Sequence, residues 1–171
     1  MRNEVRQTPY TGLSVGWMWW NPRDRAEPRA TPCRGNRIEA NHIHHVMRIL
    51  SDGGCIYTLG DQPGSTIRGN LLHDVPANAG RAESNGMFLD QGTGSYRIEE
   101  NVVYNVARSP LRFHKGWKNL VRRNVLEVGE GVPPVRYNDT RQERITLEDN
   151  QVVRSVPPDV LEAAQRSTGP E

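Results

Sequence analysis

Two aspartates have the surroundings that most suggest chemistry. Asp52 stands just ahead of the predicted strand 55–59, and Asp90 ends the predicted strand 87–90. Paired carboxylates suit glycoside hydrolysis, in which one protonates the leaving oxygen while the other attacks the sugar or activates water. Asp52 precedes Gly53-Gly54 and Asp90 precedes Gln91-Gly92, so a role as a turn former is the alternative for each.

Five more polar side chains are predicted to gather on the same side of the molecule and to bind or orient a sugar: Tyr57, Glu83, Arg112, His114 and Lys115. A His or an Arg beside a carboxylate shifts its pKa and can hydrogen-bond a sugar. The basic residues keep a second chemistry open, β-elimination from a uronate polymer, which needs a base and a charge neutraliser such as Arg or Ca²⁺. Hydrolysis needs no cofactor, and we predict no metal site.

The elements that must position these residues are marked by a short phrase that recurs five times. Each copy has an asparagine, an aliphatic residue three positions before it and another two positions after it. Successive asparagines are 23 to 31 residues apart, which is typical of a solenoid whose units stack to bury their apolar faces. The asparagines are Asn41, Asn70, Asn101, Asn124 and Asn150; the residues before them are Ile38, Ile67, Ile98, Val121 and Leu147; those after them are Ile43, Leu72, Val103, Leu126 and Val152.

Each phrase is too short and too rich in β-branched residues for a helix, so we predict a strand, a bend at the asparagine and a second strand. Asparagine tolerates the left-handed backbone conformation that such a bend needs. In coils about 4.8 Å apart, the amides are expected to hydrogen-bond along the axis as a ladder. Aligning 86–92 with 110–116 also places Asp90 beside His114 of the next coil.

These patterns predict an all-β protein, a right-handed parallel β-helix of about five coils. A leucine-rich repeat fits less well because the L-x-x-L-x-L run is missing, and a β-sandwich is a third alternative. We expect the repeats over residues 36–156. Residues 1–35 would form the edge of the solenoid, with a strand over 11–20 and a loop rich in Trp and Pro; residues 157–171 would form a helix that caps the final coil, and a tail.

Three tryptophans, two histidines and two cysteines are also assigned roles. Trp17, Trp19 and Trp20 are expected to cover the open end of the solenoid, and stacking on sugar rings is the alternative. His44 and His73 occupy equivalent positions of successive copies and are predicted to form a structural ladder. Cys55 is expected to be a buried strand thiol, and a disulfide to Cys33 is possible but not indicated.

Composition narrows the classes of partner. The chain has 171 residues with 22 Lys and Arg against 20 Asp and Glu, a balance that gives no electrostatic reason to expect nucleic acid or an anionic membrane as a partner. No apolar run approaches the 18 residues of a membrane span, and the first residues lack the apolar core of a signal peptide.

The segments 36–44, 51–60, 70–74 and 86–90 resemble those of bacterial right-handed β-helix repeat proteins. The nearest group is the glycoside hydrolase family 141 type within the pectate-lyase-like superfamily, which is linked to xylan and fucosylated pectin side chains. The resemblance implies a plant-type polysaccharide as substrate, Asp52 and Asp90 as the catalytic carboxylates, and a secreted or periplasmic location.

The resemblance covers roughly residues 11–158, with two departures. Cys55 occupies a position that resembles one where the group usually has glycine. Members of the group are also several times longer than this chain. The chain therefore looks like the C-terminal coils of such an enzyme, and the N-terminal coils of a longer parent chain would be its partner in forming the cleft. A structural or glycan-binding β-helix without turnover is the alternative outside catalysis.

Overall fold

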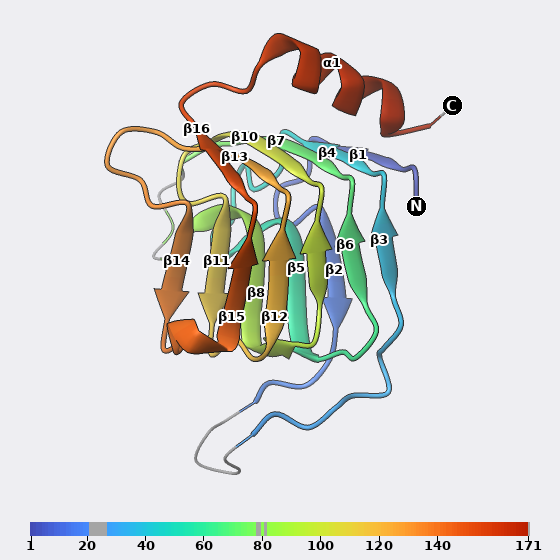
Figure 1. The fold of residues 1–171 in the computed structure, drawn as a ribbon, viewed down its shortest axis with the longest axis vertical. Helices are drawn as coiled ribbons and strands as arrows, with labels where there is room; N and C mark the ends of the chain where they lie inside the picture. Colours follow the sequence, from blue (N-terminus) through green and yellow to red (C-terminus); the bar gives the residue numbers. More distant parts are fainter. Residues whose placement is uncertain (21–26, 78–79, 81, 171) are drawn as a thin grey trace.

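A computed structural model describes residues 1–20, 27–77, 80 and 82–170 (Figure 1). Three parallel β-sheets dominate these residues. Sheet A contains β1 (Glu4–Arg6), β4 (His42–His44), β7 (Leu71–Val75), β10 (Val102–Val106), β13 (Val125–Glu127) and β16 (Gln151–Val153). Sheet B contains β2 (Leu13–Gly16), β5 (Gly53–Asp61), β8 (Ser84–Gly94), β11 (Leu111–His114) and β14 (Val135–Asn138). Sheet C contains β3 (Arg37–Glu39), β6 (Thr66–Arg68), β9 (Arg97–Glu99), β12 (Asn119–Arg122) and β15 (Ile145–Glu148).

The chain visits the three sheets in turn, so that each winding adds one strand to A, B and C. Every strand pairs in parallel with its counterpart one winding further on; Ile43 lies opposite Leu72 in sheet A, and Ile67 lies opposite Ile98 in sheet C. The predicted parallel stacking of the repeats is therefore confirmed. Short elements complete the described chain: a 3₁₀ turn (Gln142–Arg144) and α1 (Pro158–Ser167).

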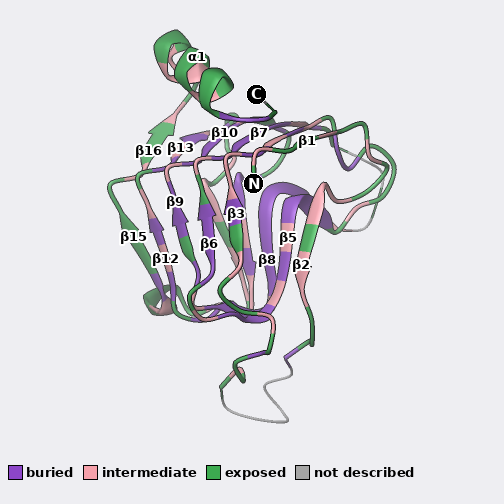
Figure 2. Ribbon diagram, turned by 90° about the vertical axis from the view of Figure 1, so that its right-hand side faces the viewer, coloured by how far each residue is buried: buried purple, intermediate pink, exposed green. Residues whose placement is uncertain are grey.

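The aliphatic residues of the repeated phrase form the core between the sheets. Those of the middle windings are fully buried, and Figure 2 shows the central strands as buried along most of their length. Phe113 and Met87 of sheet B fill the same core. Cys55 is also buried there as predicted, and burial raises the pKa of its thiol. It and Cys33 are both free thiols.

The predicted asparagine ladder is confirmed. The amide of Asn70 donates to the side-chain oxygen of Asn101 at 2.8 Å, and the same bond joins each of the five asparagines to the next. Asn3 extends the ladder by one rung, since its amide donates to Asn41 at 3.0 Å. Val5 stands two positions after Asn3, as an aliphatic residue does in the other copies of the phrase.

The prediction that the asparagines themselves adopt the left-handed conformation is wrong. The residue before each asparagine has the positive φ, and none of the six asparagines, all in the described part of the chain, has one. The bend is thus made one residue earlier, which leaves each asparagine free to turn its amide into the core. The left-handed residues are Arg2, Ala40, Gly69, Glu100, Arg123 and Asp149.

The prediction that the C-terminal helix caps the final coil is also wrong. Figure 1 shows α1 lying across the outer side of sheet A. Its residues Val160, Leu161 and Ala164 pack against an outward-facing apolar strip that includes Leu71 and Val102. Burying that strip removes apolar surface from water, so the helix runs back across the strands until the Gly169 N–H donates to the Ala40 carbonyl at 3.0 Å.

The end of the last winding consequently keeps apolar surface. Leu147 and Val152, which end the two aliphatic series, are 48% and 52% exposed.

At the other edge, β2 covers part of the strand predicted over 11–20, and β1 adds a strand that the sequence pattern did not predict. The predicted Pro-rich loop falls partly on residues 21–26, which lie outside the described residues. Among the described residues, no helix combines the length and apolar character that crossing a membrane requires.

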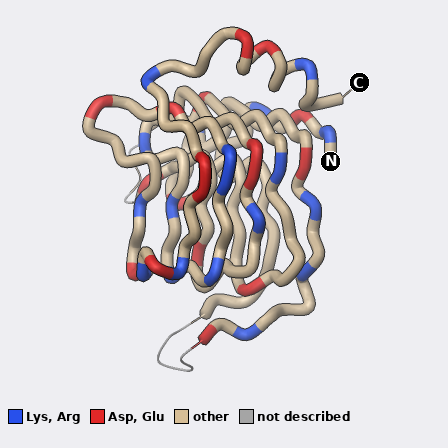
Figure 3. Tube along the Cα trace, viewed as in Figure 1, with Lys and Arg blue, Asp and Glu red and all other residues tan. Residues whose placement is uncertain are grey.

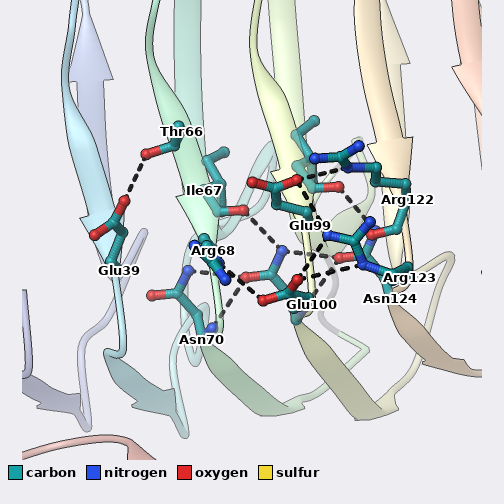
Figure 4. Close-up of polar contacts among 12 residues, drawn as sticks. Glu39, Thr66, Ile67, Arg68, Asn70, Glu99, Glu100, Arg122, Arg123 and Asn124 are labelled. Atoms are coloured by element: carbon teal, nitrogen blue, oxygen red, sulfur yellow. Dashed lines mark hydrogen bonds and ion pairs between the residues drawn. The ribbon is translucent and has the colours of Figure 1, made fainter.

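The outer face of sheet C carries charges of alternating sign, which Figure 3 shows as alternating red and blue across its strands. Register places five charged side chains in one row: Glu39, Arg68, Glu99, Arg122 and Glu148. In Figure 4 Arg122 contacts Glu99, and the neighbouring Arg123 contacts Glu100. This solvated ionic face differs sharply from the outer face of sheet B.

Candidate functional site

The outer face of sheet B carries two rows of side chains. Because side chains alternate along a strand, the residues between the core positions point outward. In the first row, register places Tyr57 beside Phe88, and Phe88 beside Arg112. In the second row, Leu59 lies beside Asp90, and His114 beside Asn138.

Asp90 is the most constrained polar group on this face. It is only 6% exposed. The Tyr57 hydroxyl donates to its Oδ2 at 2.7 Å, and the Gln91 backbone N–H donates to its Oδ1 at 2.8 Å. His114 Nδ1 lies 2.7 Å from the same Oδ1, so the predicted stacking of Asp90 and His114 in successive windings is confirmed. The carboxylate is therefore fixed in orientation from three sides.

His114 links the buried Asp90 carboxylate to the exposed surface. Its Nδ1 is held by Asp90, while its Nε2 lies 3.7 Å from Oδ2 of Asp139, a side chain that is 77% exposed. Asp139 was missed by the sequence analysis. Aligning 137–140 with 113–116 would have found Asp139, because it follows Asn138 as Lys115 follows His114. Asp139 and Lys115 also share a positive φ.

Tyr57 is held as a hydrogen-bond donor. Burial raises the pKa of its phenol, and the bond to the Asp90 carboxylate and the nearby charge of Asp52 raise it further. The phenol thus keeps its proton over the range in which carboxylates ionise, and that proton points at Asp90. Its ring also packs edge-on against Phe88, with centroids 5.3 Å apart.

Asp52 lies on the same face as Asp90, although seven residues separate it from the position beside Asp90. It has a left-handed backbone (φ 68°) directly before β5, and its Oδ1 lies 3.4 Å from Nη1 of Arg112. The charges of Asp52 and Asp90 both raise the pKa of Tyr10, whose main shift comes from burial. Asp52 is also joined to the Tyr10 hydroxyl, which donates to its backbone carbonyl at 2.8 Å.

The remaining predicted residues are divided between this region and its margins. Arg112 lies over the Phe88 ring, 4.1 Å from its centroid, which fixes the guanidinium between Asp52 and the second row. Lys115 donates to the Gln91 side chain at 3.2 Å, next to Asp90. Glu83 lies apart from Asp90, at the other end of β8, and pairs with Arg136 at 2.8 Å.

Two exposed tryptophans border the second row. Trp17 and Trp19 are 77% and 75% exposed, so the expectation that they cover the solenoid end is wrong for both. Together with Met18 and Leu59 they line a pocket of about 400 Å³, and Leu59 lies beside Asp90 in register. Trp20, in contrast, is buried and packs 6.3 Å from Trp117.

Polar and aromatic side chains thus occupy one continuous surface. Exposed indole rings offer flat apolar faces, and the two rows of sheet B offer a carboxylate, an imidazole and a guanidinium as hydrogen-bonding partners. Among the described residues, His and carboxylate groups spaced as metal ligands lie on sheet A and not on this face.

Comparisons with known proteins identify the fold only. Neither a family model nor a curated protein sequence matches the chain. One solved structure, named "Glycoside hydrolase", is similar with a TM-score of 0.52 and 22% sequence identity. The alignment covers 99% of this chain and 22% of that chain, so the protein spans about a fifth of the length of this structural relative.

Proposed function

We propose that the protein is a carbohydrate-active, right-handed parallel β-helix of the pectate-lyase-like kind, and that the outer face of sheet B binds a polysaccharide. A general rule supports the right-handed winding, because connections between parallel strands of one sheet are right-handed in about 98% of cases. The name of the structural relative agrees with a role in carbohydrate chemistry.

One observation carries this proposal: two exposed indole rings line a pocket with Leu59, and Leu59 lies in register beside a buried, firmly held carboxylate on the outer face of sheet B. A polysaccharide presents the matching features, since its rings have apolar C–H faces and its edges carry hydroxyl groups. Trp17 and Trp19 would stack on sugar rings, while Arg112 and His114 would hydrogen-bond the hydroxyl groups. Lys115 and Glu83 would contact sugars further along the chain.

The reaction we propose is hydrolysis of a glycosidic bond, with Asp52 and Asp90 as acid and as base or nucleophile. Tyr57 and His114 hold the Asp90 carboxylate in place, and preorganisation of this kind lowers the cost of reaching the transition state. Arg112 lies against Asp52 and would orient it. No step requires a cofactor. As in the group that the sequence resembles, we propose that the protein acts outside the cytoplasm and that further coils of a longer chain complete the cleft.

The test is turnover of a polysaccharide panel that includes xylan and pectin. We expect new reducing ends without new ultraviolet absorbance, and loss of at least 100-fold in rate in Asp90→Asn. The matched control is Glu148→Gln, a carboxylate on sheet C, which should keep the wild-type rate. Absorbance from an unsaturated product would instead establish a uronate lyase, and binding without either product would establish a glycan-binding module.

A further inference from the structure

The outer face of sheet A carries four histidines in two successive windings. His42 and His44 flank the inward-facing Ile43 and therefore point outward. His44 lies beside His73 in register, and their rings stack with centroids 4.9 Å apart and planes 5° from parallel. The predicted stacking of these two histidines in successive windings is thus confirmed, but it does not account for His45.

A left-handed residue follows the same position of three neighbouring sheet A strands, β4, β7 and β10. His45, Asp74 and Asn105 have φ of 52°, 55° and 48°, and each follows a residue of one register row, since His44 pairs with His73 and His73 with Tyr104. Consecutive side chains of a regular strand point to opposite faces. The left-handed backbone instead turns His45 beside His44, so that their Nδ1 atoms are 2.8 Å apart.

We propose that His44 Nδ1, His45 Nδ1 and Asp74 Oδ2 bind a divalent first-row transition metal such as Zn²⁺ or Fe²⁺. Asp74 Oδ2 lies 3.3 Å from His45 Nδ1, and all three ligand atoms lie within 4.8 Å of one another. Bonds of 2.0–2.1 Å to a tetrahedral ion would place ligand atoms about 3.3 Å apart. Two imidazoles and one carboxylate on one side of an ion also match a recurrent transition-metal triad that leaves other positions open.

Neighbouring groups already orient these three ligands. The other nitrogen of His44, Nε2, lies 3.2 Å from a carboxylate oxygen of Glu4. Asp74 Oδ2 lies 2.7 Å from His73 Nδ1, and its Oδ1 accepts a hydrogen bond from the Asn105 amide. A carboxylate on the far nitrogen of a ligating His and a donor on a ligating Asp are the usual outer partners of a metal site.

A competing triad on the same face is less well arranged. Glu4, His42 and His44 also bring ligand atoms within 4.8 Å of one another. However, His42 Nε2 is engaged by His73 Nε2 at 2.7 Å, and Glu4 is shared with Arg6 at 3.5 Å. The proposed triad differs in that His45 and Asp74 line a pocket, while Glu4 is the partner of His44 Nε2 and orients that ligand.

The proposed triad also adjoins space for a further ligand. His45 and Asp74 line a pocket of about 450 Å³ together with Arg48 and Glu127. This volume is in the range of small-molecule sites, so a metal held there has room for water or a small ligand. The site is on sheet A and is independent of the glycan face of sheet B.

Calorimetric titration of the metal-free protein with ZnCl₂ tests the proposal. We expect one Zn²⁺ per chain and no competition from Ca²⁺, which prefers oxygen ligands. His45→Ala and Asp74→Asn should each weaken Zn²⁺ binding at least tenfold. His42→Asn, the matched control from the competing triad, should change it less than threefold. Circular dichroism will confirm that each variant is folded, and visible absorption of the Co²⁺ form should be lost in His45→Ala.

Three results would overturn the proposal. The first is the absence of saturable Zn²⁺ binding by the wild-type protein at micromolar concentrations. The second is loss of binding in His42→Asn with retention in His45→Ala, which would assign the metal to the competing triad. The third is equal binding of Ca²⁺ and Zn²⁺, which would indicate an unspecific surface charge effect. None of these results bears on glycan turnover.

Discussion

Asn101→Ala tests the asparagine ladder where it is most deeply buried. The Asn101 side chain accepts two hydrogen bonds from Asn70, at 3.0 Å from its backbone N–H and 2.8 Å from its amide. It donates to the Ile67 carbonyl at 3.0 Å and to the Asn124 side chain at 2.9 Å. Asn70, Asn101 and Asn124 are each at most 1% exposed, so water cannot replace the lost partners.

Alanine at this position leaves two buried N–H groups of Asn70 without a partner and removes one hydrogen bond each from the Ile67 carbonyl and the Asn124 side chain. Each unpaired buried group costs about 1–3 kcal/mol, and partial relaxation brings the expected loss to about 3–5 kcal/mol. Since domains are typically stable by about 5–15 kcal/mol, the variant should unfold at a much lower urea concentration.

Asn150→Ala is the matched control, because Asn150 forms the last rung. It accepts the same two bonds from Asn124 but is partly exposed at the end of the last winding, so water can replace its amide. We expect a loss of about 1 kcal/mol. The assay is urea unfolding followed by far-ultraviolet circular dichroism. Equal losses in the two variants, within about 0.5 kcal/mol, would refute the reasoning that burial makes the ladder strong.

Three further predictions concern single side chains. Tyr57→Phe removes the donor to Asp90, so steady-state kinetics should show kcat about tenfold lower, or about 1.4 kcal/mol, with an unchanged melting temperature; an unchanged kcat would separate Tyr57 from the chemistry. Trp19→Ala should weaken glycan binding by about 1 kcal/mol in calorimetry without altering urea stability, and equal affinity would remove Trp19 from the binding face. The ion pairs with Arg123 and Arg68 lower the pKa of Glu100, so its stabilisation is present above the unfolded pKa and is lost as pH falls through the folded pKa. Glu100→Gln should therefore cost about 0.5–1 kcal/mol near pH 7 and less near pH 3, and a pH-independent cost would contradict this assignment.

The repeated phrase was sufficient to predict the core and the stacking, because both depend on residue types at fixed spacing. A buried asparagine amide needs hydrogen-bond partners, and few arrangements supply them. Asparagine therefore recurs at equivalent positions, and the sequence alone reveals where those positions are. The same alignment brought Asp90 and His114 together correctly. Predictions failed at positions where many residue types can occupy the same backbone conformation.

Arg2, Ala40 and Glu100 illustrate such a permissive position. They share the left-handed conformation before the asparagine although they have no side-chain chemistry in common, so the bend could not be located from residue type. His45 is similar, since nothing in its identity indicates the turn that brings it beside His44. The place of α1 depended on which of two adjacent aliphatic residues, such as Leu71 and Leu72, faces outward.

The central claim is that a polysaccharide binds along the outer face of sheet B, and NMR of the four indole N–H groups tests it most directly. Titration with the oligosaccharide that the protein turns over or binds best should shift the Trp17 and Trp19 signals strongly. Those of Trp20 and Trp117, which are at most 9% exposed, should move little. Saturable binding that leaves Trp17 and Trp19 unshifted, while backbone signals of sheet C or sheet A move, would contradict the account.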